Sequence, residues 1–362
     1  MDFSDINWIA LAAALLAAAT PLAFAAIGEL VVEKSGVLNL GVEGMMIVGA
    51  ICGFAVAVES GSPTLGVLAA ASGSALLALL FGFLTQVLLA NQVATGLALT
   101  LFGLGLSSLI GQPYAGIKPP ETGQLDLPVL SDLPVLGPIL FAQDALVYLA
   151  VALIAAVALF LTRSRAGLIL RAVGESHDAA HALGYPVVRI RLLAIAFGGA
   201  AAGVGGAYLS LFRVPQWTEG MTAGAGWIAL AIVVFATWKP WRVLLGAWLF
   251  GGVTILQLNI QAADIDLLPL LAWGCLAGAG LLAALRWGRG RGDYAVALVV
   301  GAIGILCLAV LLIWPDAVLG AAYLSMTPYL VTIMVLVLMS AQRLRASLNA
   351  PASLGRTFHA ST

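Results

Sequence analysis

Eleven long apolar stretches divide this chain, and nothing else in the sequence limits the possible fold as strongly. Most are close to the ~20 residues that an α-helix needs to cross a bilayer. Only 9% of the 362 residues are charged and the mean hydropathy is +1.07, whereas a soluble domain carries about 25% charged residues. The sequence therefore predicts an all-α, polytopic transmembrane helix bundle. The stretches are residues 8–27, 38–58, 65–89, 93–111, 139–161, 192–212, 227–238, 243–260, 267–285, 294–314 and 323–340.

The basic residues predict how these spans are oriented. When residues 163–191 are placed in the cytoplasm and the spans alternate, 14 of the 16 Lys and Arg residues fall on the cytoplasmic side. The two exceptions are Lys118 and Arg213. Cytoplasmic loops of membrane proteins carry an excess of Lys and Arg, so we expect the N-terminus outside and the C-terminus inside.

The cytoplasmic loop 163–191 is the most polar segment, with five arginines and two of the three histidines. Its inner part predicts a short helix, because Ser176 is a suitable N-cap and Gly184 followed by Pro186 stops a helix. Two alanines and Leu183 would give this helix a small, smooth face. Such a helix, held between two spans, suits docking into another protein. An ordinary solvated loop with a frayed turn is the alternative.

Polar residues also occur where lipid is expected, first around the start of the second span. Asn39 and Glu43 lie there among three glycines, Gly36, Gly41 and Gly44, which weaken a regular helix. We expect a broken or re-entrant start, which is tolerated only inside protein or beside water. Glu43 needs a partner or a raised pKa at this depth. Both polar residues could contact a solute or could form structural bonds that fix the break.

Two further polar clusters flank spans. Amides both donate and accept hydrogen bonds, so they suit a neutral polar ligand such as a sugar or a nucleobase. Their position near predicted membrane interfaces explains them equally well. The cluster opening the fourth span is Asn91, Gln92 and Thr95, and the cluster closing the eighth is Gln257, Asn259 and Gln261.

Several kinds of chemistry are excluded by the sequence. None of the lysines, Lys34, Lys118 and Lys239, lies in a phosphate-binding GxxxxGK[ST] loop, so this chain is not a P-loop ATPase. His177 and His181 have helical zinc-site spacing, but a third ligand is not evident. We therefore expect no metal, no cofactor bound by this chain and no nucleic-acid partner.

Five stretches occur in an order that points to one family. They are GELVVEKSGVLNLGVEGMMIVGA, NQVATGLALTLFGLGLSSL, LSDLPVLGPIL, RAVGESHDAAHALGYPV and PYLVTIMVLVLMSAQRLRASLNAPASLGRTF. Together they resemble the permease subunit of bacterial nucleoside and simple-sugar ABC importers, within the branched-chain amino-acid permease group. The resemblance covers residues 20–262 and 323–358.

The resemblance implies a multi-pass permease of the bacterial inner membrane, surrounded by lipid, that performs no ATP chemistry itself. It implies as partners a second homologous permease, ABC ATPase subunits that bind ATP and Mg, and an extracytoplasmic substrate-binding lipoprotein. The solute would be a nucleoside or a similar small polar molecule. The coupling residues implied for the ATPase contact are Glu175, Ser176, Asp178, Ala179, Ala180, Leu183, Gly184 and Pro186. The candidate solute path comprises Asn39, Glu43, Asn91, Gln92, Thr95, Gln257 and Asn259.

The domain organisation departs from the family between the eighth and the last span. Nine spans are family-like, and residues 263–321 form an inserted hairpin of two apolar spans. Residues 1–262 then make the permease core, with an outside loop at 112–138, and residues 322–362 make the last span and a cytoplasmic tail. The outside loop holds six of the fifteen prolines, which suits contact with a soluble partner, although a passive connector is equally consistent.

A stand-alone secondary transporter or channel is the alternative function. Against it, no predicted span carries the Asp, Glu or His relay expected for proton coupling, beyond Glu43 and Asp144. Neighbouring genes for a P-loop ATPase and a lipoprotein would favour the ABC importer.

Overall fold

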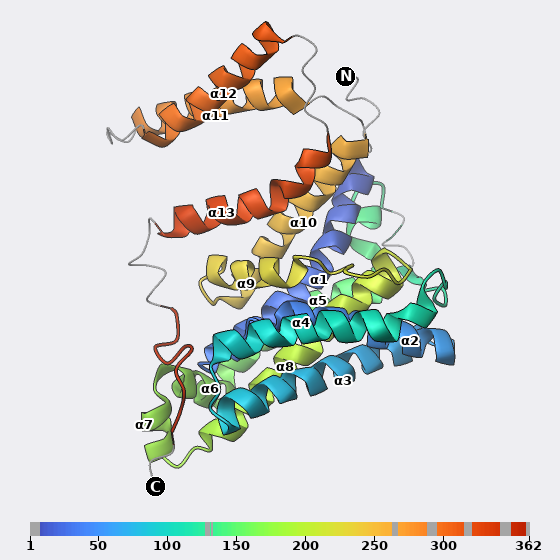
Figure 1. The fold of residues 1–362 in the computed structure, drawn as a ribbon, viewed down its shortest axis with the longest axis vertical. Helices are drawn as coiled ribbons and strands as arrows, with labels where there is room; N and C mark the ends of the chain where they lie inside the picture. The colour runs from blue at the N-terminus through green and yellow to red at the C-terminus, as the bar shows by residue number, and fades with distance from the viewer. Residues whose placement is uncertain are drawn as a thin grey trace. The chain divides into compact units, whose positions relative to one another are not determined.

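The computed structural model describes residues 8–126, 131, 133–262, 267–287, 295–314, 321–340 and 349–359. The described chain is nearly all helical (Figure 1), and each of the eleven predicted stretches corresponds to one helix. The main helices are α1 (Trp8–Lys34), α2 (Val42–Ser60), α3 (Pro63–Gly82), α4 (Gln92–Gly111), α5 (Ala145–Arg163), α6 (Arg165–Glu175), α7 (His177–Ala182), α8 (Val187–Ala207), α9 (Ala225–Phe235), α10 (Pro240–Ala262), α11 (Leu267–Trp287), α12 (Ala295–Ile313) and α13 (Thr327–Ser340).

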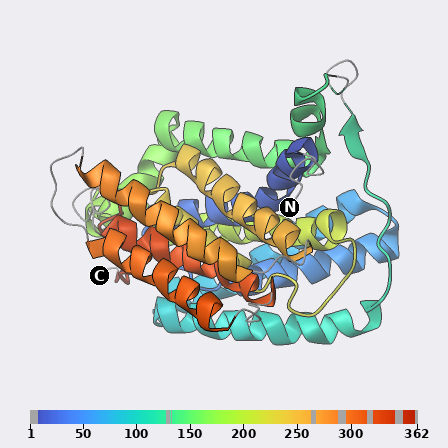
Figure 2. The same cartoon turned by 90° about the horizontal axis from the view of Figure 1, so that it is seen from above.

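Seven of the described helices are long and apolar enough to cross a membrane, and three shorter apolar segments occur at Ala225–Phe235, Leu271–Gly280 and Val300–Ile313. The prediction of a polytopic helical membrane protein is confirmed. The all-α prediction needs one small correction, because β1 (Gln124–Asp126) pairs antiparallel with β2 (Ala142–Asp144). The long connection from α4 to this ribbon is largely extended (Figure 2).

Several span boundaries differ from the prediction for local reasons. The fifth span begins at Ala145 rather than at residue 139, because a π-helical turn (Gly137–Phe141) and strand β2 precede it. The sixth begins at Val187 rather than at residue 192, because the buried Arg191 finds polar partners inside the protein. The third and sixth spans end in π-helical turns, Phe83–Val87 and Tyr208–Arg213.

The chain divides into two compact units. One comprises Met1–Ile255 and Tyr329–Thr362, and the other comprises Leu256–Pro328. In the second unit, α11 packs on α12, and Gly304 lies against the Ala272 carbonyl and Leu276.

Close approach of glycines holds the core of the first unit together. Helix α8 packs against α1, α2 and α3. A side chain at Gly49 of α2 would meet the backbone of Gly203 on α8, and one at Gly203 would meet Ser74 and the Ala70 carbonyl on α3. Small residues let helices approach in lipid, where no hydrophobic force drives them together. The small residues Gly49 and Gly203 therefore allow α2, α3 and α8 to pack closely together.

Candidate functional site

The cytoplasmic loop of the prediction forms two helices, not one. As predicted, Ser176 caps a short helix, α7, by accepting a hydrogen bond from the Ala179 amide at 3.3 Å. Gly184 has a φ of 85°, a left-handed conformation that glycine adopts without steric cost and that ends the helix. Helix α6 was not predicted. Its N-cap is Ser164, which accepts a hydrogen bond from the Gly167 amide at 2.9 Å.

Most of the predicted coupling residues lie at the surface. Leu183 is 76% exposed, so its side chain is accessible to a partner. Ala180 is different, because it is buried against Val173 and Val187. The predicted smooth face therefore lacks Ala180. The exposed members of the set are Glu175, Ser176, Asp178, Ala179, Leu183, Gly184 and Pro186.

Arg191 connects this loop to the membrane helices, and the sequence reasoning missed it. Its side chain has no exposed area. The guanidinium donates to the Ser35 carbonyl and to Gln86 Oε1, both at 3.2 Å, and lies 3.3 Å from Nδ1 of His177. The available signal was an arginine four residues into an apolar helix, because a charge at such a place requires partners.

His177 is a buried partner of this arginine. Burial lowers the pKa of His177, and the positive charge of Arg191 lowers it further, against the opposing effect of Asp178. The neutral ring can accept the hydrogen bond from Arg191 at Nδ1. The rings of His177 and His181 both lie edge-on to Phe358, with centroids 5.5 and 5.2 Å away. The histidine pair thus takes part in packing.

Glu43 and Asn39 fix the start of α2. Glu43 is buried and accepts hydrogen bonds from the Thr222 hydroxyl and the Gly226 amide, both at 2.8 Å. It thereby places a carboxylate at the N-terminus of α9, where the helix dipole favours negative charge. Asn39 accepts from the Gly41 amide at 2.9 Å. Of the two roles considered for Asn39 and Glu43, solute contact or structural bonding, these contacts correspond to structural bonding.

Gln92, a residue of the predicted solute path, has a side-chain amide that is only partly hydrogen-bonded. It is 3% exposed, and its Oε1 accepts from the Leu38 amide at 2.8 Å. Its Nε2 is buried without a partner among the described residues. Gln92 therefore lies beside the turn that carries Asn39. Its neighbour Asn91 is exposed and caps α4 by accepting from the Ala94 amide at 3.0 Å.

The remaining predicted solute residues are not brought to this turn by any described contact. Thr95 is half-buried on α4. Gln257 donates to Gln261 at 3.4 Å within the unit Leu256–Pro328, and Asn259 is exposed there.

Three further acids are held by structural contacts. Glu29 accepts from the Asn39 amide at 3.3 Å, and Glu33 accepts from the indole of Trp238. Asp144, just before α5, accepts from the Tyr208 hydroxyl at 3.1 Å. Burial raises the pKa of Asp144, while this hydrogen bond opposes the rise. Asp144 therefore has a fixed phenolic partner.

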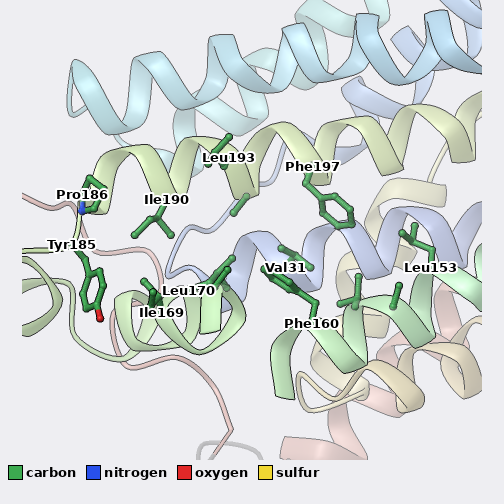
Figure 3. Close-up of a pocket in the computed structure, with 14 residues that line it drawn as sticks. Val31, Leu153, Phe160, Ile169, Leu170, Tyr185, Pro186, Ile190, Leu193 and Phe197 are labelled. Atoms are coloured by element: carbon green, nitrogen blue, oxygen red, sulfur yellow. The ribbon is translucent and has the colours of Figure 1, made fainter. Parts of the chain in front are cut away.

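A pocket of about 510 Å³ lies beside the coupling loop, between α1, α5, α6 and α8 (Figure 3). Its lining is aliphatic and aromatic, with Val31, Phe160, Leu170 and Phe197 among the residues labelled in the figure. A nucleoside or a sugar needs hydrogen-bonding groups that such a lining does not supply. The lining suits an apolar chain better than a nucleoside or a sugar.

Comparison with known proteins decides the family. Residues 11–285 match the family described as the permease component of the branched-chain amino acid transport system. This chain belongs to that permease family. No solved structure gives a significant match.

Relatives of this permease are ABC transporter subunits. It is 44% identical over 260 residues to the "Putative glucose ABC transporter permease protein TsgC13" of Haloferax volcanii, covering 71% of this chain and 79% of the relative. It is 34% identical to the guanosine ABC transporter permease protein NupQ of Bacillus subtilis, covering 70% and 82%. It is also 34% identical to the nucleoside ABC transporter permease protein NupC of Lactococcus lactis, covering 67% and 80%. The chain is a multi-pass permease subunit of an ABC transporter, which disfavours the stand-alone transporter.

Proposed function

We propose that this permease imports a small neutral polar solute, a nucleoside or a simple sugar, across the bacterial inner membrane. The observation that carries the proposal is its similarity, over about two thirds of its length, to permeases named for guanosine, nucleosides and glucose. In this proposal the chain pairs with a second homologous permease. Separate ATPase subunits hydrolyse ATP, and a binding lipoprotein delivers the solute from outside.

The site geometry supports two roles in different parts of the chain, ATPase binding and solute binding. The exposed side of α7, with Leu183 and Ala179, receives the ATPase. The buried amide of Gln92 has an unfilled donor, which suits a hydroxyl or carbonyl oxygen of a neutral solute. Asn39 and Glu43 hold the turn that positions this amide. The proposal also includes the topology of the chain. It has nine family-like spans, an added hairpin at 263–321, an outside N-terminus and an inside C-terminus.

Reconstituted uptake tests the proposal. The chain is co-expressed with a second permease, an ATPase and a lipoprotein from the same organism, and the complex is placed in proteoliposomes containing ATP. Labelled guanosine and glucose are then supplied outside with the lipoprotein. We expect saturable, ATP-dependent uptake of one of the two, suppressed by excess unlabelled compound of the same class. A complex that hydrolyses ATP and moves neither solute would overturn the solute class, and a chain that purifies without any ATPase would overturn the importer.

A further inference from the structure

The C-terminal segment 349–359 lies against the end of α6 (Figure 1). The Ser353 amide donates to the Gly174 carbonyl at 2.9 Å, and the Ser353 hydroxyl donates to the Glu175 carbonyl at 3.2 Å. These are carbonyls of the last turn of α6, which lack partners within their own helix. The tail therefore supplies the C-terminal cap of α6, directly before α7 begins.

Phe358 then anchors the tail on α7. It is 7% exposed and shares a buried cluster with Val173, Ala180 and Val187, and its ring meets both histidines of α7. Helix α7 has six residues, far below the roughly 12–15 residues that an isolated helix needs in water. Its position must come from tertiary contacts, and Phe358 provides a large apolar one.

The same tail reaches the turn between α1 and α2. The Gly355 amide donates to the Gly36 carbonyl at 3.1 Å, and Lys34 donates to the Asn349 carbonyl at 2.8 Å. Arg191 adds a bond to the Arg356 carbonyl at 3.2 Å. One guanidinium thus touches the turn at Ser35, the π-helical end of the third span, the tail and α7. It does so while buried, where each of these bonds is hard to replace by water.

We propose that residues 349–359 form a clasp that positions α7 for the ATPase and joins it to the turn at residues 35–39. Phe358 sets the position of α7, and Arg191 links α7 and the clasp to that turn. The clasp leaves Leu183 and Ala179 exposed, so it prepares the docking surface and does not cover it. The inference rests on the proposed function, because it assigns positioning residues to the same coupling site.

A titration with the ATPase separates the role of Phe358, which positions α7, from the role of Arg191, which links α7 to the turn at residues 35–39. The ATPase that co-purifies with the wild-type permease is stripped off and added back in increasing amounts to proteoliposomes, and solute uptake is recorded. For Phe358→Ala we expect the half-saturating ATPase concentration to rise about tenfold, with maximal uptake kept within about twofold. Phe358→Leu should recover most of the affinity, because leucine refills much of the cluster. For Arg191→Lys we expect ATPase affinity near wild type and maximal uptake at least about tenfold lower.

Arg356→Ala is the matched control, because its side chain is exposed and Arg191 bonds only to its backbone carbonyl. It should behave as wild type. Unchanged affinity in Phe358→Ala, or an equal loss in Arg356→Ala, would overturn the clasp. Elution profiles in detergent establish that each variant is folded, and Phe358→Ala decides the matter even where Arg191→Lys fails to fold. Failure of the wild type to bind any ATPase would instead refute the proposed function.

Discussion

Glu43 is the acidic side chain on which the start of α9 depends. Its two oxygens accept from two different buried donors, Thr222 and the Gly226 amide. In Glu43→Gln, one oxygen becomes an NH₂ group, so a single acceptor oxygen remains for the Thr222 hydroxyl and the Gly226 amide. A buried donor left without an acceptor costs about 1–3 kcal/mol. We expect a clearly lower melting temperature in detergent and reduced uptake.

Glu59→Gln is the control for this prediction. Glu59 is exposed and accepts from the Tyr114 hydroxyl at 3.2 Å, so its replacement should leave melting and uptake nearly unchanged. Equal melting temperatures for Glu43→Gln and wild type would remove Glu43 from any role in holding α9.

Gly203 is a second residue whose replacement has a predictable result. A Cβ there would fall 2.5 Å from Ser74 Cβ and closer still to the Ala70 carbonyl oxygen. Since backbone cannot yield as a side chain can, Gly203→Val should destabilise the fold by about 1–3 kcal/mol and reduce the monodisperse yield. Gly105→Val on α4 is the matched variant, because nothing lies within 4 Å of that position. Similar losses for the two variants would show that helix propensity, not packing, is responsible.

The exposed end of α7, at Leu183, is where we expect the ATPase to bind. Leu183→Asp should leave the fold intact, because the side chain is 76% exposed. It should nevertheless abolish ATPase co-purification, since a charge would be buried in the interface without a partner. Leu183→Met should retain binding. Normal recovery of the ATPase with Leu183→Asp would move the docking surface away from α7.

Gly184→Pro tests the end of the same helix. Proline cannot adopt the φ of 85° found at Gly184, so the chain between α7 and α8 must rearrange. We expect loss of transport while the lipoprotein still binds its solute. Uptake at the wild-type rate would show that the geometry of this turn does not matter for coupling.

Local signals explain which elements could be predicted. Apolar runs located every long helix, and the cap at Ser176 and the glycine at 184 located α7. Helix α6 was missed because its arginines and its single amphipathic face look like loop sequence beside the long apolar runs. The burial of Ala180 was missed for another reason, because its partner Phe358 lies at the far end of the chain. The burial of Arg191 was also missed, because three of its four partners lie 105, 156 and 165 residues away in the sequence and the fourth lies 14 residues away.

The whole molecule is predicted to have its N-terminus outside and its C-terminus inside. In a variant whose cysteines, Cys52, Cys275 and Cys307, are replaced by serine, single cysteines are placed at the exposed positions Gly123 and Ala182. A membrane-impermeant maleimide should label Gly123→Cys in spheroplasts and should label Ala182→Cys only after lysis. The reverse pattern would invert the topology and contradict the positive-inside assignment.

The contacts of the tail also concern the order in which the protein is made. Helices α6 and α7 leave the ribosome long before Ser353 and Phe358 do, so during synthesis the end of α6 lacks its cap and α7 lacks its anchor. A truncated or misinserted chain that never brings its last residues back to the cytoplasmic face would present an incomplete coupling surface. Recruitment of the ATPase would then depend on correct insertion of the final span, and the cell would gain a check on completed membrane assembly.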